Sequence, residues 1–225
     1  MIDCQPNVSN RLTIFFAFDI IHAVAGKYHD NNAGPKGEKM KETAAVAKRS
    51  INTLSLVYIA IGAALITVCS YITIPMAVPF TLQTFAVFTA LLILGGKRGT
   101  LSVLVYILMG AVGLPVFSGF KGGLGALFGK TGGYIIGFIF IGLIYTLATH
   151  FFGKKLYVEI VALILGLAVC YAFGTGWFMY IYMRDTGAVG LVTVLSWCVF
   201  PFIIPDLVKM AIAVIVSRRV RTVIK

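Results

Sequence analysis

Long apolar runs separated by short polar segments dominate the chain from residue 51 onward. Six of these runs approach the ~20 residues that a helix needs to cross a bilayer, namely 54–72, 80–94, 101–114, 134–148, 156–182 and 192–216. The runs are continuously apolar, whereas barrel strands would alternate apolar and polar residues. Backbone polar groups inside a membrane must be satisfied within the segment itself, so the pattern predicts an all-α membrane protein, a six-transmembrane-helix bundle.

The composition agrees with a membrane location. Hydrophobic residues make up 59% of the chain and charged residues only 12%, whereas soluble domains carry about 25% charged residues. The net charge of +11 lies in short clusters between the apolar runs, which does not resemble a continuous basic surface for nucleic acid. We therefore expect a multi-pass integral protein of the cell membrane, with the lipid bilayer as a partner and no nucleic acid.

The basic clusters predict the orientation of the bundle. Eleven basic residues fall on one side of the predicted spans, namely Lys41, Lys48, Arg49, Lys97, Arg98, Lys154, Lys155, Arg218, Arg219, Arg221 and Lys225. The opposite side holds only Lys121, Lys130 and Arg184. Lys and Arg accumulate in cytoplasmic loops, so both ends of the bundle are predicted to be cytoplasmic.

The first part of the chain reads differently from the rest. Its apolar stretch 12–25 is too short to span and contains Asp19 and His22; one reading is a signal-peptide core. The preferred reading is that residues 1–39 are an N-terminal extension, disordered or a mis-assigned start. Residues 40–225 then form the six-helix membrane domain.

Several stretches superficially resemble catalytic or nucleotide motifs. The sequence GGLGALFGKTGGY resembles a phosphate-binding loop. That motif requires a glycine five residues before Gly129, and this position is occupied by Leu124. The four cysteines form no C-x-x-C pair, and the histidines lack metal-ligand spacing. We expect no metal, no cofactor and no catalytic residue, hence no enzyme. Glu159 is interpreted as a helix-end partner of Lys155, and Trp177 as an interfacial residue.

One charged pair stands inside an apolar run. Asp206 and Lys209 are three residues apart within 192–216, which places both on one face of a helix. Charges inside a membrane are costly and normally face a cavity or a partner, so they suggest a ligand site. Pro201 and Pro205 precede them and leave backbone carbonyls free. The alternative is an ion pair that only neutralises itself.

A second polar group is predicted on the same side of the membrane. Thr81, Gln83 and Thr84 enter the second run from outside, and Thr131 opens the fourth run as an N-cap. The free N–H groups beside Thr131 would suit a carboxylate. Together these features predict a small outward pocket for a largely apolar molecule that has an anionic end and amide-like groups.

Four stretches, VPFTLQTFAV, GLPVFSG, GKTGGYIIGF and PDLVKMAIA, give the sequence a specific resemblance. In this order they resemble the BioY family, the biotin-specific S-components of energy-coupling factor (ECF) transporters, over residues 51–215. The resemblance implies a high-affinity subunit that captures biotin from outside for uptake into the cytoplasm. It also implies an EcfT transmembrane coupling subunit and EcfA-type ATPases as partners, and these would hydrolyse ATP.

The resemblance also implies residue roles. Ligand contacts are expected from Asp206, Lys209, Gln83, Thr131, Gly132, Gly133 and Tyr134, and docking to EcfT from Ala60 and Ala64. Small residues at that spacing suit close helix packing. The sequence departs from the family pattern at Lys130, where proline is usual, and at Pro205, where glycine is common.

Two other classes of function were weighed against this reading. A self-sufficient small-solute carrier for a related vitamin or carboxylate would be expected to show duplicated halves, and no internal repeat is visible. A membrane-embedded enzyme or scaffold would need catalytic residues that the sequence does not offer.

Overall fold

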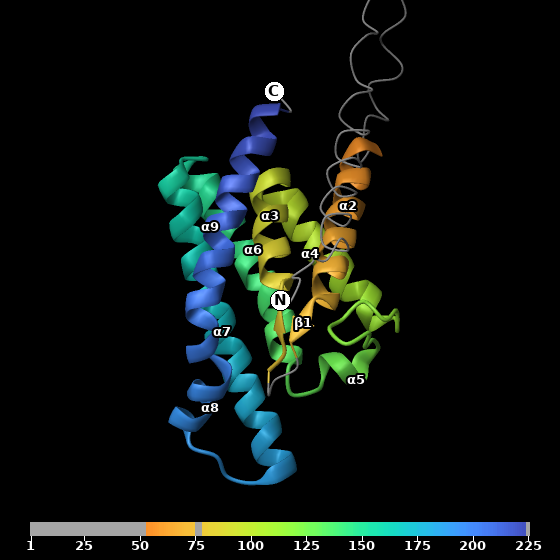
Figure 1. Cartoon of the computed structure of the whole chain (residues 1–225). Helices are drawn as coiled ribbons and strands as arrows, with labels where there is room; N and C mark the ends of the chain where they lie inside the picture. The colour runs from red at the N-terminus through yellow and green to blue at the C-terminus, as the bar shows by residue number, and fades with distance from the viewer. Residues whose placement is uncertain (1–52, 75–77, 224–225) are drawn as a thin grey trace, which may run out of the picture. The chain divides into compact units, whose positions relative to one another are not determined.

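The computed structural model describes residues 53–74 and 78–223, which belong to one packed unit (Figure 1). The interpretation of residues 1–39, and of the basic residues Lys41, Lys48, Arg49 and Lys225, falls outside the described residues. The longer helices are α2 (Thr53–Tyr71), α3 (Gln83–Leu94), α4 (Gly96–Ala111), α6 (Gly132–Phe152), α7 (Leu156–Thr186) and α9 (Phe200–Val223). Shorter elements are strands β1 (Thr73–Ile74) and β2 (Phe80–Thr81) and helices α5 (Leu124–Leu127) and α8 (Leu191–Cys198).

Helices occupy most of each of the six predicted spans, but they differ in length. Within the described part, four are long and apolar enough to cross a membrane: α2, α6, α7 and the combined segment Leu191–Thr222. Helix α3 has 12 residues, about 18 Å at 1.5 Å per residue, against a hydrocarbon core of about 30 Å. The helical character is therefore confirmed, and four helices meet the requirements of a span.

A small β-hairpin interrupts the predicted all-helical pattern. The run predicted as helix 80–94 begins as strand β2, which pairs antiparallel with β1 through Thr73–Thr81 and Ile74–Phe80. Helix α3 begins only at Gln83. The β-branched and aromatic residues of these strands favour extended backbone, and two-residue strands are too short to show a period in the sequence.

The turn between α3 and α4 is shorter than the sequence suggested. The run predicted as 101–114 corresponds to α4, which begins at Gly96 and contains Lys97 and Arg98 in its first turn. Gly95 joins the two helices at φ 81°, a conformation that glycine adopts without steric cost. Charged residues were assigned to the loop, whereas they belong to the helix, because hydropathy marks the apolar core of a helix and not its ends.

The last predicted span, 192–216, is divided in two. The break falls at Val199, whose φ of −124° leaves the helical region. Pro201, two residues later, lacks an N–H, and a proline ring clashes with the carbonyl four residues earlier, which ends a preceding helix. Helix α9 restarts at Phe200 and continues through Pro205 to Val223.

Helices α6 and α7 form the most extensive helix pair. Glycines allow this approach: a Cβ on Gly174 would collide with the Tyr134 ring, and one on Gly137 would lie 2.6 Å from the Cys170 sulfur. Helix α4 packs against both α2 and α6, and α9 packs mainly along α3. Small residues at helix contacts are the usual means of close packing inside a membrane.

One end of the bundle, here called the charged end, gathers the α3–α4 turn, the α6–α7 turn and the end of α9 (Figure 1). The two turns approach closely, because the Lys154 ammonium lies 3.8 Å from the point where a Cβ on Gly95 would stand. The predicted pairing of Glu159 with Lys155 is wrong. Glu159 is buried and accepts hydrogen bonds from Tyr145 and Arg221 instead, because it faces the bundle interior and not its surface.

Candidate ligand-binding site

A cavity opens beside the β-hairpin, at the end of the bundle away from the charged end. The hairpin, the α4–α5 connection, the residue before α6, and helices α3, α6, α7, α8 and α9 contribute to its walls. The residues are Val78, Pro79, Thr81, Gln83, Thr84, Ser118, Thr131, Tyr134, Ile135, Phe138, Leu167, Cys170, Tyr171, Cys198, Phe202, Asp206 and Lys209. The space between them, including its open mouth, is about 650 Å³.

Lys209 is held by three acceptors. Its Nζ lies 2.8 Å from Asp206 Oδ1, 2.6 Å from the backbone oxygen of Thr81 and 3.2 Å from Thr84 Oγ1. It also stands 4.0 Å from the centroid of the Phe80 ring, a favourable cation–π position. An ammonium has three protons, so each already has an acceptor.

Asp206 is satisfied from two further helices. Its Oδ1 accepts from Thr84 Oγ1 at 2.9 Å, and its Oδ2 from the Tyr171 hydroxyl at 2.5 Å. The residue is only 2% exposed. A charge buried this deeply requires several hydrogen bonds. The ion pair weighed as an alternative is therefore present, and it lies in the cavity wall.

Gln83 enters the cavity wall at the first turn of α3. Its Nε2 donates to the Tyr106 hydroxyl at 2.8 Å, and its backbone N–H donates to Thr81 Oγ1 at 3.3 Å. The amide oxygen has no role in these two contacts.

The start of α6 contributes three lining residues, Thr131, Tyr134 and Ile135, and two packing residues. Thr131 holds the N-cap position, but its side chain makes no capping hydrogen bond. The Tyr134 hydroxyl lies 3.0 Å from Thr175 Oγ1. Gly132 and Gly133 are not among the lining residues: a Cβ on Gly132 would collide with the Leu127 carbonyl, and one on Gly133 with the Trp177 side chain.

Trp177, which the sequence predicts as an interfacial residue, contacts the loop before α6. Its Nε1 donates to the backbone oxygen of Gly129 at 3.0 Å. Its ring also packs beside Phe128. Lys130 is exposed, outside the lining set, with its ammonium 4.9 Å from the centroid of the Tyr182 ring. These contacts fasten the loop before α6 to α7.

Sequence reasoning missed Tyr171. It stands in the middle of α7, and its hydroxyl donates to Asp206. That mid-helix position was the available signal, because interfacial tyrosines cluster near helix ends. Two cysteines, Cys170 and Cys198, also line the cavity as free thiols.

Ala60 and Ala64 lie on an exposed face of α2 with the apolar side chains of Leu56, Val57 and Val68. The described residues contain no group of three or more His, Cys, Asp or Glu side chains arranged to hold a metal ion.

Comparison with known proteins gives a consistent result. A family model described as "BioY family" matches residues 40–225. The "Biotin transporter BioY" of Thermotoga maritima is 39% identical over 171 residues, which cover 74% of this chain and 95% of that protein. The "Probable biotin transporter BioY" of Pyrococcus horikoshii is 40% identical over 164 residues, covering 72% and 93%.

A solved structure is also similar. It is described as the "S-component for biotin from an ECF-type ABC transporter", with a TM-score of 0.66 and 27% identity. The match covers 76% of this chain and 92% of the other. The family model extends over the helices that build the cavity, and the chain belongs to the BioY family.

Proposed function

We propose that this protein is the high-affinity biotin-binding subunit, or S-component, of an ECF-type ABC transporter. The observation that carries the proposal is the buried Asp206–Lys209 pair in the wall of an open cavity, in a chain of the BioY family. Similar proteins are named biotin transporters. The similar structure is an S-component for biotin.

The cavity offers chemistry that fits biotin. The ureido ring has N–H donors, and Asp206 can accept from them, because a carboxylate has about four lone-pair positions and three hydrogen bonds reach it here. The walls are otherwise largely apolar, with Phe138, Leu167 and Phe202 available to the hydrocarbon part. The pair therefore orients the polar ring, and the apolar walls supply the contact area.

The anionic end of biotin has two candidate sites. One is the start of α6, because helix N-termini attract carboxylates and the Thr131 side chain makes no capping hydrogen bond there. The N–H groups of Gly132 and Tyr134 already donate to the backbone oxygens of Gly129 and Thr131, so a ligand carboxylate would compete with these two acceptors. Lys209 is the other. A ligand oxygen that bonds to Lys209 must replace Thr81 or Thr84 as its acceptor, because all three protons already have partners.

We extend the proposal to the membrane arrangement. Helices α3 and α4, together with the four longer spans, would complete six crossings. The basic residues of α4, of the α6–α7 turn and of α9 gather at the charged end (Figure 1). The positive-inside rule would then put the charged end in the cytoplasm and the cavity on the outer side.

The proposal includes an EcfT coupling subunit and EcfA-type ATPases as partners. The exposed face of α2 with Ala60 and Ala64 supplies a surface where another helix can approach closely. The similar structure comes from an ECF-type ABC transporter. ATP hydrolysis would then be the work of the partners, and this chain would bind and release the ligand.

The test is purification followed by ligand analysis. We expect biotin to co-purify, to be detected by mass spectrometry after denaturation, and to titrate the emptied protein with one saturable site. A protein that neither carries nor binds biotin contradicts the proposal. Biotin uptake into liposomes by the chain alone would instead support the self-sufficient carrier.

The hydroxyl of Tyr171 is expected to matter for biotin binding. Tyr171→Phe keeps the ring but removes the proton that Oδ2 of Asp206 accepts, so a buried carboxylate loses one of its three donors. The net contribution of a hydrogen bond to a charged group is ~1.5–3 kcal/mol, and we expect biotin affinity to fall about tenfold. Calorimetric titration measures it, with Tyr180→Phe, at an exposed position of the same helix, as control. Equal affinities for the two variants would contradict the role of Tyr171.

Residues 1–39 are proposed to be dispensable. The family model begins at residue 40, where Met40 offers an alternative start. A chain that starts at Met40 should reach the membrane and take up radiolabelled biotin at the full-length rate when produced with its partners. Loss of membrane insertion in the shortened chain would instead indicate a targeting role for residues 1–39.

A further inference from the structure

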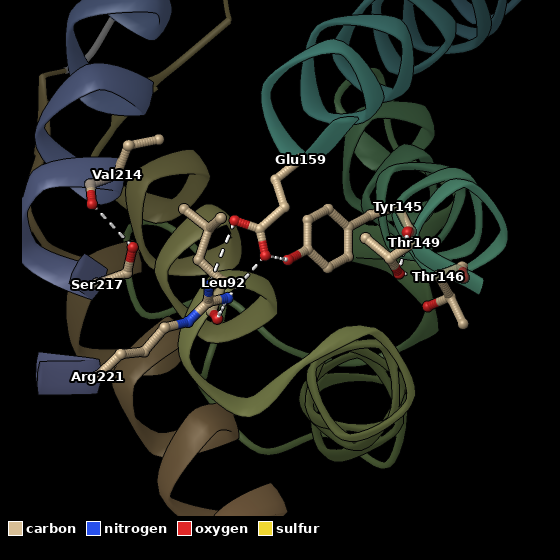
Figure 2. A network of polar contacts seen from close by, with 8 residues as sticks. All are labelled: Leu92, Tyr145, Thr146, Thr149, Glu159, Val214, Ser217 and Arg221. Carbon is tan, nitrogen blue, oxygen red and sulfur yellow. Dashed lines mark hydrogen bonds and ion pairs between the residues drawn. The ribbon is translucent and has the colours of Figure 1, made fainter. Parts of the chain in front are cut away.

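A polar cluster at the charged end lies apart from the ligand cavity (Figure 2). The Glu159 side chain is only 4% exposed. It accepts from the Tyr145 hydroxyl at 3.0 Å and from the Arg221 guanidinium at 2.9 and 3.3 Å. Arg221 also donates to the backbone oxygen of Leu92. One ion pair thereby joins four helices: α3, α6, α7 and α9.

Leu92 and Glu159 lie at helix ends, and the partial charges of these ends favour the contacts that Arg221 makes. Leu92 belongs to the last turn of α3, whose final carbonyls have no partner within the helix and carry partial negative charge. Glu159 belongs to the first turn of α7, where the partial charge is positive. Arg221 therefore bridges a site that favours a cation and a site that favours an anion. We call the Glu159–Arg221 contact, with its bond to Leu92, the clasp.

The clasp repeats, at the charged end, a connection that already exists at the cavity. At the cavity, α9 bonds to α7 through Asp206 and Tyr171; at the charged end it bonds to α7 through Arg221 and Glu159. At 1.5 Å per residue the two levels are about 18 Å apart along α7 and about 22 Å apart along α9. The same two helices, α3 and α7, are bonded to α9 at both levels.

This arrangement makes the position of α9 depend on both levels. Helix α9 packs mainly along α3, so hydrogen bonds from long polar side chains connect it to α7. A helix attached at one level can tilt about that level, whereas a helix attached at two cannot tilt without breaking a bond. A tilt of α9 would separate the Asp206 carboxylate from the Tyr171 hydroxyl, which are 2.5 Å apart.

We propose that Glu159 and Arg221 are positioning residues for ligand capture: the clasp fixes α9 against α7 so that Asp206, Lys209 and Tyr171 meet at the cavity. They act through α9 and do not touch the ligand. The inference rests on the proposed function, since biotin is the ligand whose affinity reports it.

The first measurement is biotin affinity of purified variants below their unfolding temperature. Arg221→Leu and Glu159→Gln should each raise the dissociation constant about tenfold, and Arg221→Lys, which keeps the charge but loses the forked geometry, should raise it less. The matched control is Arg219→Leu, which removes a charge from an exposed position of the same helix end and should leave affinity unchanged. The double variant Glu159→Gln/Arg221→Leu should bind biotin no more weakly than Arg221→Leu alone, because both substitutions break the same contact.

The second measurement distinguishes positioning from general support. Amide hydrogen exchange without biotin should be faster in residues 200–209 of the Arg221→Leu variant than in the same residues of the Arg219→Leu variant. These residues lie at the opposite end of α9 from both substitutions. A merely structural clasp would lower the unfolding temperature and loosen only the charged end. If Arg221→Leu does not fold, Glu159→Gln and Arg221→Lys carry both measurements.

Unchanged biotin affinity in folded Arg221→Leu and Glu159→Gln would overturn the inference, as would unchanged exchange in residues 200–209. Failure of the proposed function gives a different result. Wild-type protein would then not bind biotin, while the exchange comparison would still decide whether the clasp positions α9.

Discussion

Asp206→Asn and Lys209→Met should each weaken biotin binding by at least tenfold in calorimetric titration. Each substitution leaves the other member of the pair in a buried site without its counter-charge. Truncating one partner of a buried, hydrogen-bonded charge pair costs ~2–5 kcal/mol, and each ~1.4 kcal/mol is a tenfold change in affinity. Asp206→Asn also places an amide N–H₂ where the ureido donors are proposed to bind, so its effect should be the larger.

The double variant Asp206→Asn/Lys209→Met separates the two readings of the pair. It removes both charges, and replacing a buried ion pair as a unit is often neutral for stability. If the pair contacts the ligand, the double variant should fold as well as the wild type and still not bind biotin with high affinity. Near-wild-type affinity in the single or double variants would mean that the pair is purely structural and that the ligand lies elsewhere.

Ala60→Trp or Ala64→Trp should abolish biotin uptake by cells that produce the chain with its proposed EcfT and EcfA-type partners. Both alanines are exposed on α2 and outside the cavity wall. A helix that packs against small residues approaches within a distance that an indole ring prevents. Titration of the same purified variants should give biotin affinity within about twofold of the wild type.

The control for this experiment is Leu147→Trp, a similar enlargement at an exposed position of α6. It should leave both uptake and binding intact, since lipid can accommodate the ring. Equal loss of binding and uptake in the α2 variants would refute a docking surface and point to a disturbed bundle. Retained uptake would show that this face meets only lipid.

Hydropathy located the helices because a bilayer imposes length and apolarity on each crossing. It failed at their ends, where Lys97 and Arg98 lie inside α4 and strand β2 replaces the start of a helix. It also overlooked the break at Val199 between α8 and α9, although Pro201 supplies the physical cause. Local composition sets the core of a span, whereas ends depend on individual residues and their tertiary neighbours.

The polar sites divide in the same way. Asp206 and Lys209 could be singled out because two charges in an apolar run are expensive and lie on one helix face. Tyr171 is 35 positions from Asp206 in sequence, so its mid-helix position could mark it as unusual but could not show that Asp206 is its partner. Glu159 was assigned to a near neighbour, whereas its partner Arg221 is 62 positions away. Contacts across the bundle require knowledge of which helices adjoin.

The three acceptors around Lys209 bear on which solutes the empty cavity admits. An ammonium with free protons would attract any small anion in the medium, and chloride or acetate would compete with the ligand. Here the protons are already shared with Asp206, Thr81 and Thr84, so an anion that brings no further contacts exchanges one acceptor for another and gains little. The cavity then selects a molecule that also packs against its apolar walls, and small anions of the medium do not occupy it.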